Sequence, residues 1–418
     1  MALKNILKII FCIAITSLAI PLTGLTGKAT TDYQQELGQI EYSASVRIRQ
    51  PEATLNDPES FFKKAYYSFL KNSLTGNPYD IEKTEAAFEK ALASFPESVD
   101  LQLLYLTHNL KLHRLEAAKA GIAKLSFMDD DPKVQVLKTD IAIQEGHYTA
   151  AATRLQNILG KNRTWDNLSR LAYLRAKQGN FDEADRLYRE AEEEISAKDM
   201  RSYAWVELQR GYLALSRGQY QAAWDHYRQA DHAYSGYWLT QEYMAEWLGT
   251  QRNFEAAAAL YRRIATCAIR PDLYHALGDL YLFMGRPELA QPWHDKALAV
   301  YLDSARRGEA RYYHHLASLY ADARLDGAEA VKWARKDIEL RQNAATRDAL
   351  AWALFRNGQY RESLDEIKKV LSYDWQDAHL FYHAAMIHLA AGRAEEGKDY
   401  LQKAVRINPH YDAFHVHR

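Results

Sequence analysis

The stretch that decides the fold is Asp272–Val300, which reads DLYHALGDLYLFMGRPELAQPWHDKALAV. Apolar residues recur every three or four positions on both sides of Gly285, as expected for two amphipathic helices. A glycine just past a helix adopts the left-handed conformation that ends the helix and turns the chain back. The small residues Gly278 and Ala290 would then let the two helices approach closely. The stretch therefore predicts a pair of antiparallel helices.

The same pattern returns along most of the chain. In each copy a small residue follows the turn glycine by five positions, and a larger packing residue follows it by nine. The copies are Gly146 with Ala151 and Leu155, Gly179 with Ala184 and Tyr188, Gly218 with Ala223 and Tyr227, Gly285 with Ala290 and His294, Gly358 with Ser363 and Ile367, and Gly392 with Gly397 and Leu401. Another copy has Arg252 in place of the glycine, followed by Ala257 and Tyr261.

These units resemble tetratricopeptide repeats. About ten of them begin near residues 60, 99, 132, 165, 204, 238, 271, 310, 344 and 378, and the eighth has an extra residue around Gly327. One pair of helices cannot bury both of its faces, so such units stack on one another. The resemblance implies an all-α fold: a right-handed superhelical α-solenoid over residues 60–418, with a concave wall lined by the first helix of each unit.

The N-terminal residues have the pattern of a secretory signal. Met1–Lys8 is short and basic, Ile9–Leu22 is almost entirely apolar, and Gly27-Lys28-Ala29 resembles a cleavage site. The apolar stretch is shorter than the ~20 residues that cross a bilayer. We therefore expect a signal peptide at 1–29 and an exported protein, periplasmic or extracellular. The alternative is an uncleaved segment that anchors the chain in the membrane.

Residues 30–59 are polar and contain proline, and we expect them to form an N-terminal arm or linker. Within them, Ile40, Tyr42, Ala44, Val46 and Ile48 alternate with polar residues. That period of two predicts an extended segment lying on the next element. A mostly disordered linker is the alternative.

Composition and motifs exclude several function classes. Lys plus Arg (53) nearly balances Asp plus Glu (54), which disfavours a bulk attraction to nucleic acid. No Gly-rich phosphate loop, G-x-S-x-G or H-E-x-x-H occurs. Cys267 has small and apolar neighbours and is expected to be a buried structural thiol. His383 and His388 diverge on a helix, as do His314 and His315, so we expect no metal site, no cofactor and no enzymatic activity.

The resemblance also implies which residues face the groove. From the first helices of the fourth to eighth units these are Tyr173, Trp205, Leu208, Tyr212, Glu242, Glu246, Asp272, His275, Asp279, Arg311 and His314. Residues 203–247 hold eleven Tyr and Trp, beside the carboxylates of the sixth and seventh units. Aromatic anchors beside an acidic patch suit an extended segment with apolar and basic side chains. The alternative is that these aromatic residues pack between units and the acids only solvate the groove.

These observations favour a non-enzymatic scaffold of the cell envelope that binds segments of partner proteins in its groove. The alternative is a periplasmic component of polysaccharide export or a glycan-binding protein, because Trp and Tyr rings suit sugar faces. Self-association through the end units is a further expectation.

Overall fold

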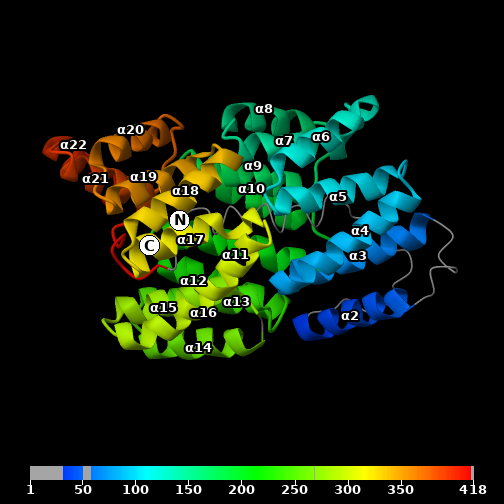
Figure 1. The fold of residues 1–418 in the computed structure, drawn as a ribbon, viewed down its shortest axis with the longest axis horizontal. Helices are drawn as coiled ribbons and strands as arrows, with labels where there is room; N and C mark the ends of the chain where they lie inside the picture. Colours follow the sequence, from blue (N-terminus) through cyan, green and yellow to red (C-terminus); the bar gives the residue numbers. More distant parts are fainter. Residues whose placement is uncertain (1–31, 50–57, 268, 416–418) are drawn as a thin grey trace.

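Ten antiparallel helix pairs follow one another along the chain in the computed structural model, which describes residues 32–49, 58–267 and 269–415 (Figure 1). The pairs are α3 (Pro58–Thr75) with α4 (Ile81–Ser94), α5 (Val99–Lys111) with α6 (Leu115–Lys124), α7 (Pro132–Gln144) with α8 (Tyr148–Leu159), α9 (Trp165–Lys177) with α10 (Phe181–Glu193), α11 (Met200–Ser216) with α12 (Tyr220–Ala233), α13 (Trp238–Thr250) with α14 (Phe254–Cys267), α15 (Pro271–Phe283) with α16 (Pro287–Arg306), α17 (Tyr313–Ser318) with α18 (Gly327–Leu340), α19 (Ala344–Arg356) with α20 (Tyr360–Leu371), and α21 (Ala378–Ala390) with α22 (Ala394–Ile407). The predicted all-α solenoid of about ten repeats is confirmed.

In the described part of the chain, four short helical turns lie next to or between these helices. They are the 3₁₀ turns η2 (Pro78–Asp80), η3 (Ser126–Met128) and η4 (Ala310–Tyr312), and the π-helical turn η5 (Leu319–Ala323). The π turn continues α17 and takes up the extra residue of the eighth unit. Within the described ranges no helix is long and apolar enough to span a bilayer. The predicted signal at 1–29 lies outside those ranges.

The turn chemistry is as predicted from the sequence. All six turn glycines have φ between +70° and +83°, and Arg252 has φ +60° where its unit lacks glycine. The small residues that follow are buried, so the second helix of a pair lies close to the first. In the ninth pair, for example, the Ser363 hydroxyl donates a hydrogen bond of 2.7 Å to the Ala351 carbonyl.

Successive turns of the superhelix touch one another. Asn343 donates a hydrogen bond of 3.0 Å to the Gln144 carbonyl, which joins the start of the ninth pair to the third. Lys177 forms an ion pair of 3.0 Å with Asp377, which joins the fourth pair to the tenth. Units six apart in the chain are therefore in direct contact, which joins successive turns of the superhelix.

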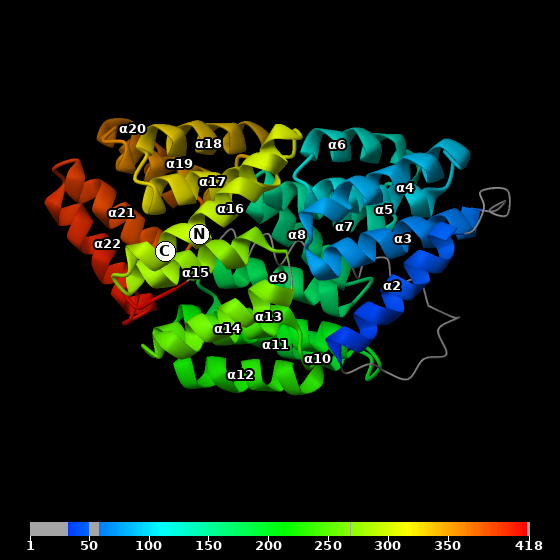
Figure 2. The same ribbon diagram turned by 60° about the horizontal axis from the view of Figure 1, so that its bottom comes forward.

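A helix precedes the first pair, where the sequence predicted an extended segment or a disordered linker. Both alternatives are wrong for α2 (Tyr33–Arg49), which lies beside α3 in both views of the ribbon (Figures 1 and 2). Tyr33 and Ile40 are buried, and Leu37 packs between them, so the apolar stripe has helical spacing. The Glu36 carboxylate lies 2.8 Å from the Arg201 guanidinium and so ties α2 to the fifth pair.

Candidate binding site

Two neighbouring cavities lie inside the solenoid. The first, of about 90 Å³, is bordered by α9, α10, α11, α13 and the start of α21. The second, of about 550 Å³, is bordered by α15, η5, α19 and α21. His379, Tyr411 and His415 line both, so the cavities are adjacent. We treat them together as the candidate binding site.

One position of the repeat supplies most of the wall. It is the ninth residue of a unit, counted from the predicted unit starts, and its side chain points to the interior in six of the ten units. These residues are Tyr173, Tyr212, Glu246, Asp279, Trp352 and Met386. Side chains one turn of helix apart face the same way, and stacking the units brings the same position of each onto one surface.

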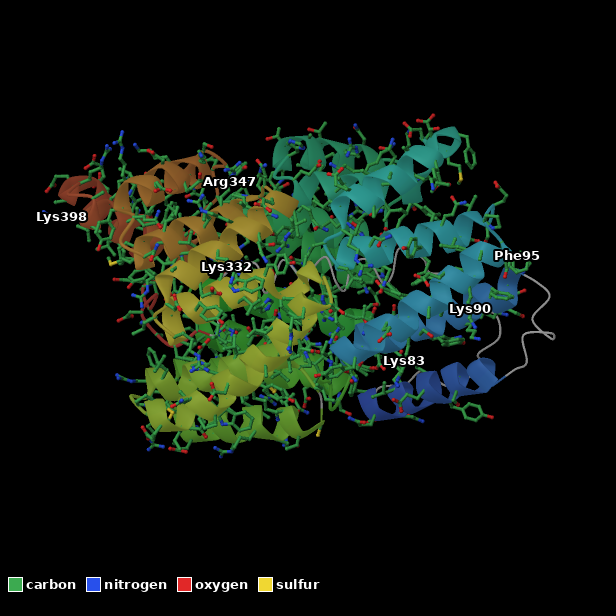
Figure 3. The ribbon with its side chains drawn as sticks, viewed as in Figure 1. Lys83, Lys90, Phe95, Lys332, Arg347 and Lys398 are labelled. Atoms are coloured by element: carbon green, nitrogen blue, oxygen red, sulfur yellow. The ribbon has the colours of Figure 1, made fainter. Side chains whose placement is uncertain are left out.

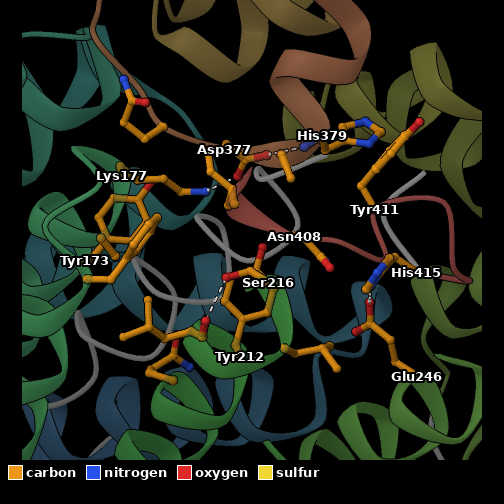
Figure 4. Close-up of a pocket in the computed structure, with 18 of the residues that line it drawn as sticks. Tyr173, Lys177, Tyr212, Ser216, Glu246, Asp377, His379, Asn408, Tyr411 and His415 are labelled. Atoms are coloured by element: carbon orange, nitrogen blue, oxygen red, sulfur yellow. Dashed lines mark hydrogen bonds and ion pairs between the residues drawn. The ribbon is translucent and has the colours of Figure 1, made fainter. Parts of the chain in front are cut away.

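The segment that follows α22, Asn408–His415, closes the site from one side. Asn408, Tyr411 and His415 line the first cavity, and Figure 4 shows His415 next to Glu246. Phe414 is buried against Gly249, where a Cβ atom would lie 2.3 Å from the phenylalanine ring. The imidazole Nδ1 of His415 lies 3.7 Å from the Glu246 carboxylate. The interior thus already holds an aromatic side chain and a basic one.

The predicted groove residues divide into two sets. Tyr173, Tyr212 and Glu246 line the first cavity and Asp279 lines the second. The other seven line neither of these two cavities and are buried: Trp205, Leu208, Glu242, Asp272, His275, Arg311 and His314. The structure therefore brings together four of the eleven, and these four share the same repeat position.

Most aromatic residues of 203–247 are packing residues. Six of the eleven are buried: Trp205, Tyr227, Tyr234, Tyr237, Trp238 and Tyr243. Trp238, for example, donates a hydrogen bond of 2.7 Å to the Leu74 carbonyl and lies 3.6 Å under the Arg270 guanidinium. For these six residues the alternative interpretation is correct: they pack between helices and do not face a groove.

The site also contains residues that the sequence analysis missed. Asp322, Trp352, His379 and His383 line the second cavity from the last three units. Trp352 was detectable, because it occupies in the ninth unit the position of Tyr173 in the fourth. Asp322 had no such signal, since the π-helical turn shifts it out of the repeat register.

The site carries a negative charge. Five carboxylates line the two cavities, from Glu246, Asp279, Asp322, Asp377 and Asp412, against two cations, from Lys177 and Arg356. With neutral histidines the balance is 2 − 5 = −3. Such a wall attracts cationic side chains.

The pKa values of two of these carboxyl groups, Asp322 and Asp377, are shifted in opposite directions. Burial raises the pKa of Asp322 to about 6, although the Trp352 indole donates a hydrogen bond of 3.0 Å to it. Burial also acts to raise the pKa of Asp377, but the ammonium of Lys177 outweighs it and holds that pKa below its usual value. Asp377 is therefore the more firmly ionised of the two.

One further interpretation, that of Cys267, is corrected outside the cavities. Cys267 is exposed at the end of α14, so the prediction of a buried thiol is wrong. The side chain of Glu192, near the end of α10, is only 14% exposed and meets the Arg210 guanidinium at 3.0 Å. Its neighbours Glu193 and Glu194 are exposed. Burial, together with the charge of Glu207, raises the pKa of Glu192 to about 7.

The raised pKa of Glu192 makes stability depend on pH. The folded state holds this proton more tightly than the unfolded state, so the stabilisation is present in acid and is lost as pH rises towards 7. We expect Glu192→Gln to be more stable than the parent by about 1–3 kcal/mol at pH 8 and equal to it near pH 4. Urea unfolding across that range measures the difference. Glu193→Gln is the matched control. If the free energy of unfolding changed with pH in the same way in both variants, the raised pKa would not belong to Glu192.

Comparisons with known proteins agree with the repeat pattern. Family models described as tetratricopeptide repeat match residues 271–303 and 349–412. A TPR repeat-containing protein YpiA of Bacillus subtilis (strain 168) is 38% identical over 60 residues, which is 14% of this chain and 14% of the relative's length.

Solved structures of low similarity also align. A human IFIT1 dimer with PPP-AAAA has 13% identity and a TM-score of 0.46, over 96% of this chain and 94% of that one. A tetratricopeptide repeat protein from Parabacteroides merdae ATCC 43184 has 19% identity and a TM-score of 0.36, over 58% of this chain and 93% of that one. Likenesses of this size do not bear on function.

The matched segments coincide with helix pairs of the solenoid. Residues 271–303 cover α15 and most of α16, and residues 349–412 run from α19 through α22. The left-handed turns and buried small residues extend the same construction to the other pairs. The chain therefore contains tetratricopeptide repeats at residues 271–303 and 349–412, and its other helix pairs are built in the same way.

Proposed function

We propose that the chain is a non-enzymatic scaffold that binds an extended segment of a partner protein along the two cavities. Tetratricopeptide repeats generally serve protein–protein interaction, which supports a protein partner. The partner segment would carry aromatic or apolar side chains and at least one Arg or Lys, because the wall combines aromatic residues with an excess of carboxylates.

The observation that carries this proposal is the segment Asn408–His415. It forms consecutive turns along one side of the cavities, with Phe414 in the space left by Gly249 and His415 beside Glu246. An aromatic anchor followed by a basic group is the chemistry that we assign to the partner. The second cavity, of about 550 Å³, remains beside this segment and would take side chains of the partner.

The cell-envelope location belongs to the same proposal. Its support is the pattern of basic, apolar and small residues at 1–29, which is typical of a secretory signal. Retention of that segment would instead anchor the scaffold in the membrane. Glycan binding finds less support, because the Trp352 ring already stacks on His383 at 4.0 Å and on Phe355 at 4.8 Å. Less of its face is then open to a sugar ring.

Reversing one exposed charge of the site tests the proposal. Asp412 lines the second cavity and is exposed, so Asp412→Lys should leave the melting temperature unchanged. We expect it to weaken the binding of labelled peptides that contain Phe and Arg by about three- to tenfold, because it opposes their charge. Fluorescence anisotropy with a peptide library measures the effect.

The control is Glu193→Lys, which makes the same change at an exposed carboxylate of α10 outside both cavities. Peptides that bind the parent and Glu193→Lys alike, but bind Asp412→Lys less, support the site. Equal binding by all three proteins contradicts it. Retention on a polysaccharide column, with no peptide bound, would favour the glycan alternative.

A further inference from the structure

Three side chains able to bind a metal ion converge between α15 and α16. His275 and Asp279 are one helical turn apart on α15, and His294 reaches them from α16. One candidate ligand atom from each lies within 4.8 Å of the others. The cluster combines two imidazoles and one carboxylate, which is a donor set that Zn²⁺ accepts.

The distances suit a tetrahedral ion. With bonds of about 2.0–2.1 Å to nitrogen and oxygen, two ligand atoms of such an ion lie about 3.3–3.4 Å apart. The Asp279 carboxylate oxygen lies 2.9 Å from Nε2 of His294 and 3.6 Å from Nε2 of His275. These two values bracket the required spacing, and the ligand atoms of the two imidazoles lie no more than 4.8 Å apart. Side-chain shifts of about 1 Å or less would bring the three ligands about one point.

The sequence departs from the repeat at this place. The position of His294 holds Leu155, Tyr188, Tyr227, Tyr261 or Ile367 in other units, where it packs between helices. The residue opposite it is Gly278, where a Cβ atom would lie 2.3 Å from the imidazole Cδ2 of His294. Glycine therefore provides the room that this ring needs to reach Asp279. Gly211 lies beside Tyr227 in the same way in the fifth unit, so the histidine alone departs from the repeat.

The surroundings are buried on one side and open on the other. The side chains of His275 and His294 are 3% and 4% exposed, whereas that of Asp279 is 22% exposed and borders the second cavity. The Nε2 atom of His294 and the Asp279 carboxylate lie at the hydrogen-bond distance of 2.9 Å, and a cation bound by both would replace this contact and bring in His275 as a third ligand. A fourth ligand would enter from the cavity, as in zinc sites with three protein ligands and one open position.

We propose that His275, Asp279 and His294 bind one divalent transition-metal ion of the zinc class, with its fourth coordination position open to the second cavity. This replaces the expectation from the sequence that the chain has no metal site. It goes beyond the proposed scaffold function and does not depend on it. The spacing of His275 and Asp279 along one helix does not by itself indicate the site, because the third ligand, His294, lies 19 residues from His275 on another helix.

The test is a metal titration of the full chain, made without a polyhistidine tag and stripped with a chelator. Calorimetry with ZnCl₂ should show one ion per chain, and CoCl₂ should give the visible absorption of a site with fewer than six ligands. We expect Asp279→Asn to bind Zn²⁺ at least about tenfold more weakly. His294→Tyr, which restores a residue found at this repeat position in other units, should abolish binding.

The matched control is Asp348→Asn, the same change at another buried carboxylate that contacts a histidine, His383, at 3.0 Å. It should bind Zn²⁺ like the parent. Circular dichroism checks that each variant folds. If Asp279→Asn fails to fold, His294→Tyr still provides the test. Zn²⁺ should raise the melting temperature of the parent and not of His294→Tyr. Equal affinity in the parent and both variants, no binding at all, or loss only on replacing His410 and His415 would each overturn the proposal.

Discussion

Replacing Arg170 with leucine is expected to lower the free energy of unfolding by about 3–5 kcal/mol, because it strands two buried carboxylates. The Arg170 side chain in α9 is 2% exposed. Its Nε donates a hydrogen bond of 2.9 Å to Asp140 in α7, and its Nη1 donates one of 2.9 Å to Asp166. Side-chain exposure is 3% for Asp140 and 8% for Asp166, so water cannot take the place of the guanidinium.

The pH dependence of this loss follows from Asp140. Burial raises the pKa of that carboxyl group even with Arg170 beside it. Without Arg170 the folded state would hold the proton still more tightly, and neutralisation would remove part of the cost. The difference in free energy of unfolding between Arg170→Leu and the parent should therefore be larger at pH 8 than at pH 5. Urea unfolding at the two pH values measures it.

Two controls separate this cost from a loss of surface charge. Arg186→Leu breaks an exposed pair with Glu190 and should cost less than about 1 kcal/mol. Replacing Asp140 and Asp166 by leucine together with Arg170 should recover much of the lost stability, because no unpaired charge remains. A loss below about 1 kcal/mol for Arg170→Leu alone would contradict the assignment.

The helix pairs could be predicted from the sequence because local chemistry determines them. A turn glycine such as Gly285 fixes where one helix ends, and a small residue five positions later fixes where the next helix crosses it. Predicted unit starts at 99, 132, 165, 238, 271, 344 and 378 coincide with the first residues of α5, α7, α9, α13, α15, α19 and α21. α2 was missed because its apolar stripe begins at Tyr33, ahead of the alternating residues.

The binding site was only partly predictable, because the pitch of the superhelix shapes it. The repeat register alone identifies Tyr173, Tyr212, Glu246 and Asp279, and it extends to Trp352. No local pattern indicates that Lys177 meets Asp377, 200 residues away, or that the segment after α22 returns to the interior. These long-range contacts decide which first-helix residues face a cavity and which, like Trp205, are covered.

Contacts between superhelical turns are expected to make Gly146→Ala destabilising by about 2–5 kcal/mol. One part, about 1–2 kcal/mol, is the cost of placing an L-residue at φ +83°. The other, about 1–3 kcal/mol, is crowding, because the new Cβ would lie 2.8 Å from the backbone carbonyl oxygen of Gln342. That oxygen belongs to the chain entering the ninth pair, so the clash would push the third and ninth pairs apart.

The matched control for this clash is Gly358→Ala. Gly358 has φ +75°, and a Cβ atom there would meet nothing within 4 Å, so only the conformational cost remains. Urea unfolding should show a larger loss in free energy of unfolding for Gly146→Ala than for Gly358→Ala. Amide hydrogen exchange should accelerate at Ala344, whose N–H donates to the Tyr148 hydroxyl, in that variant alone. If both variants lost the same free energy of unfolding and amide exchange at Ala344 did not change, contacts between superhelical turns would not contribute to stability. The shape of the cavities would then depend only on packing within and between neighbouring repeats.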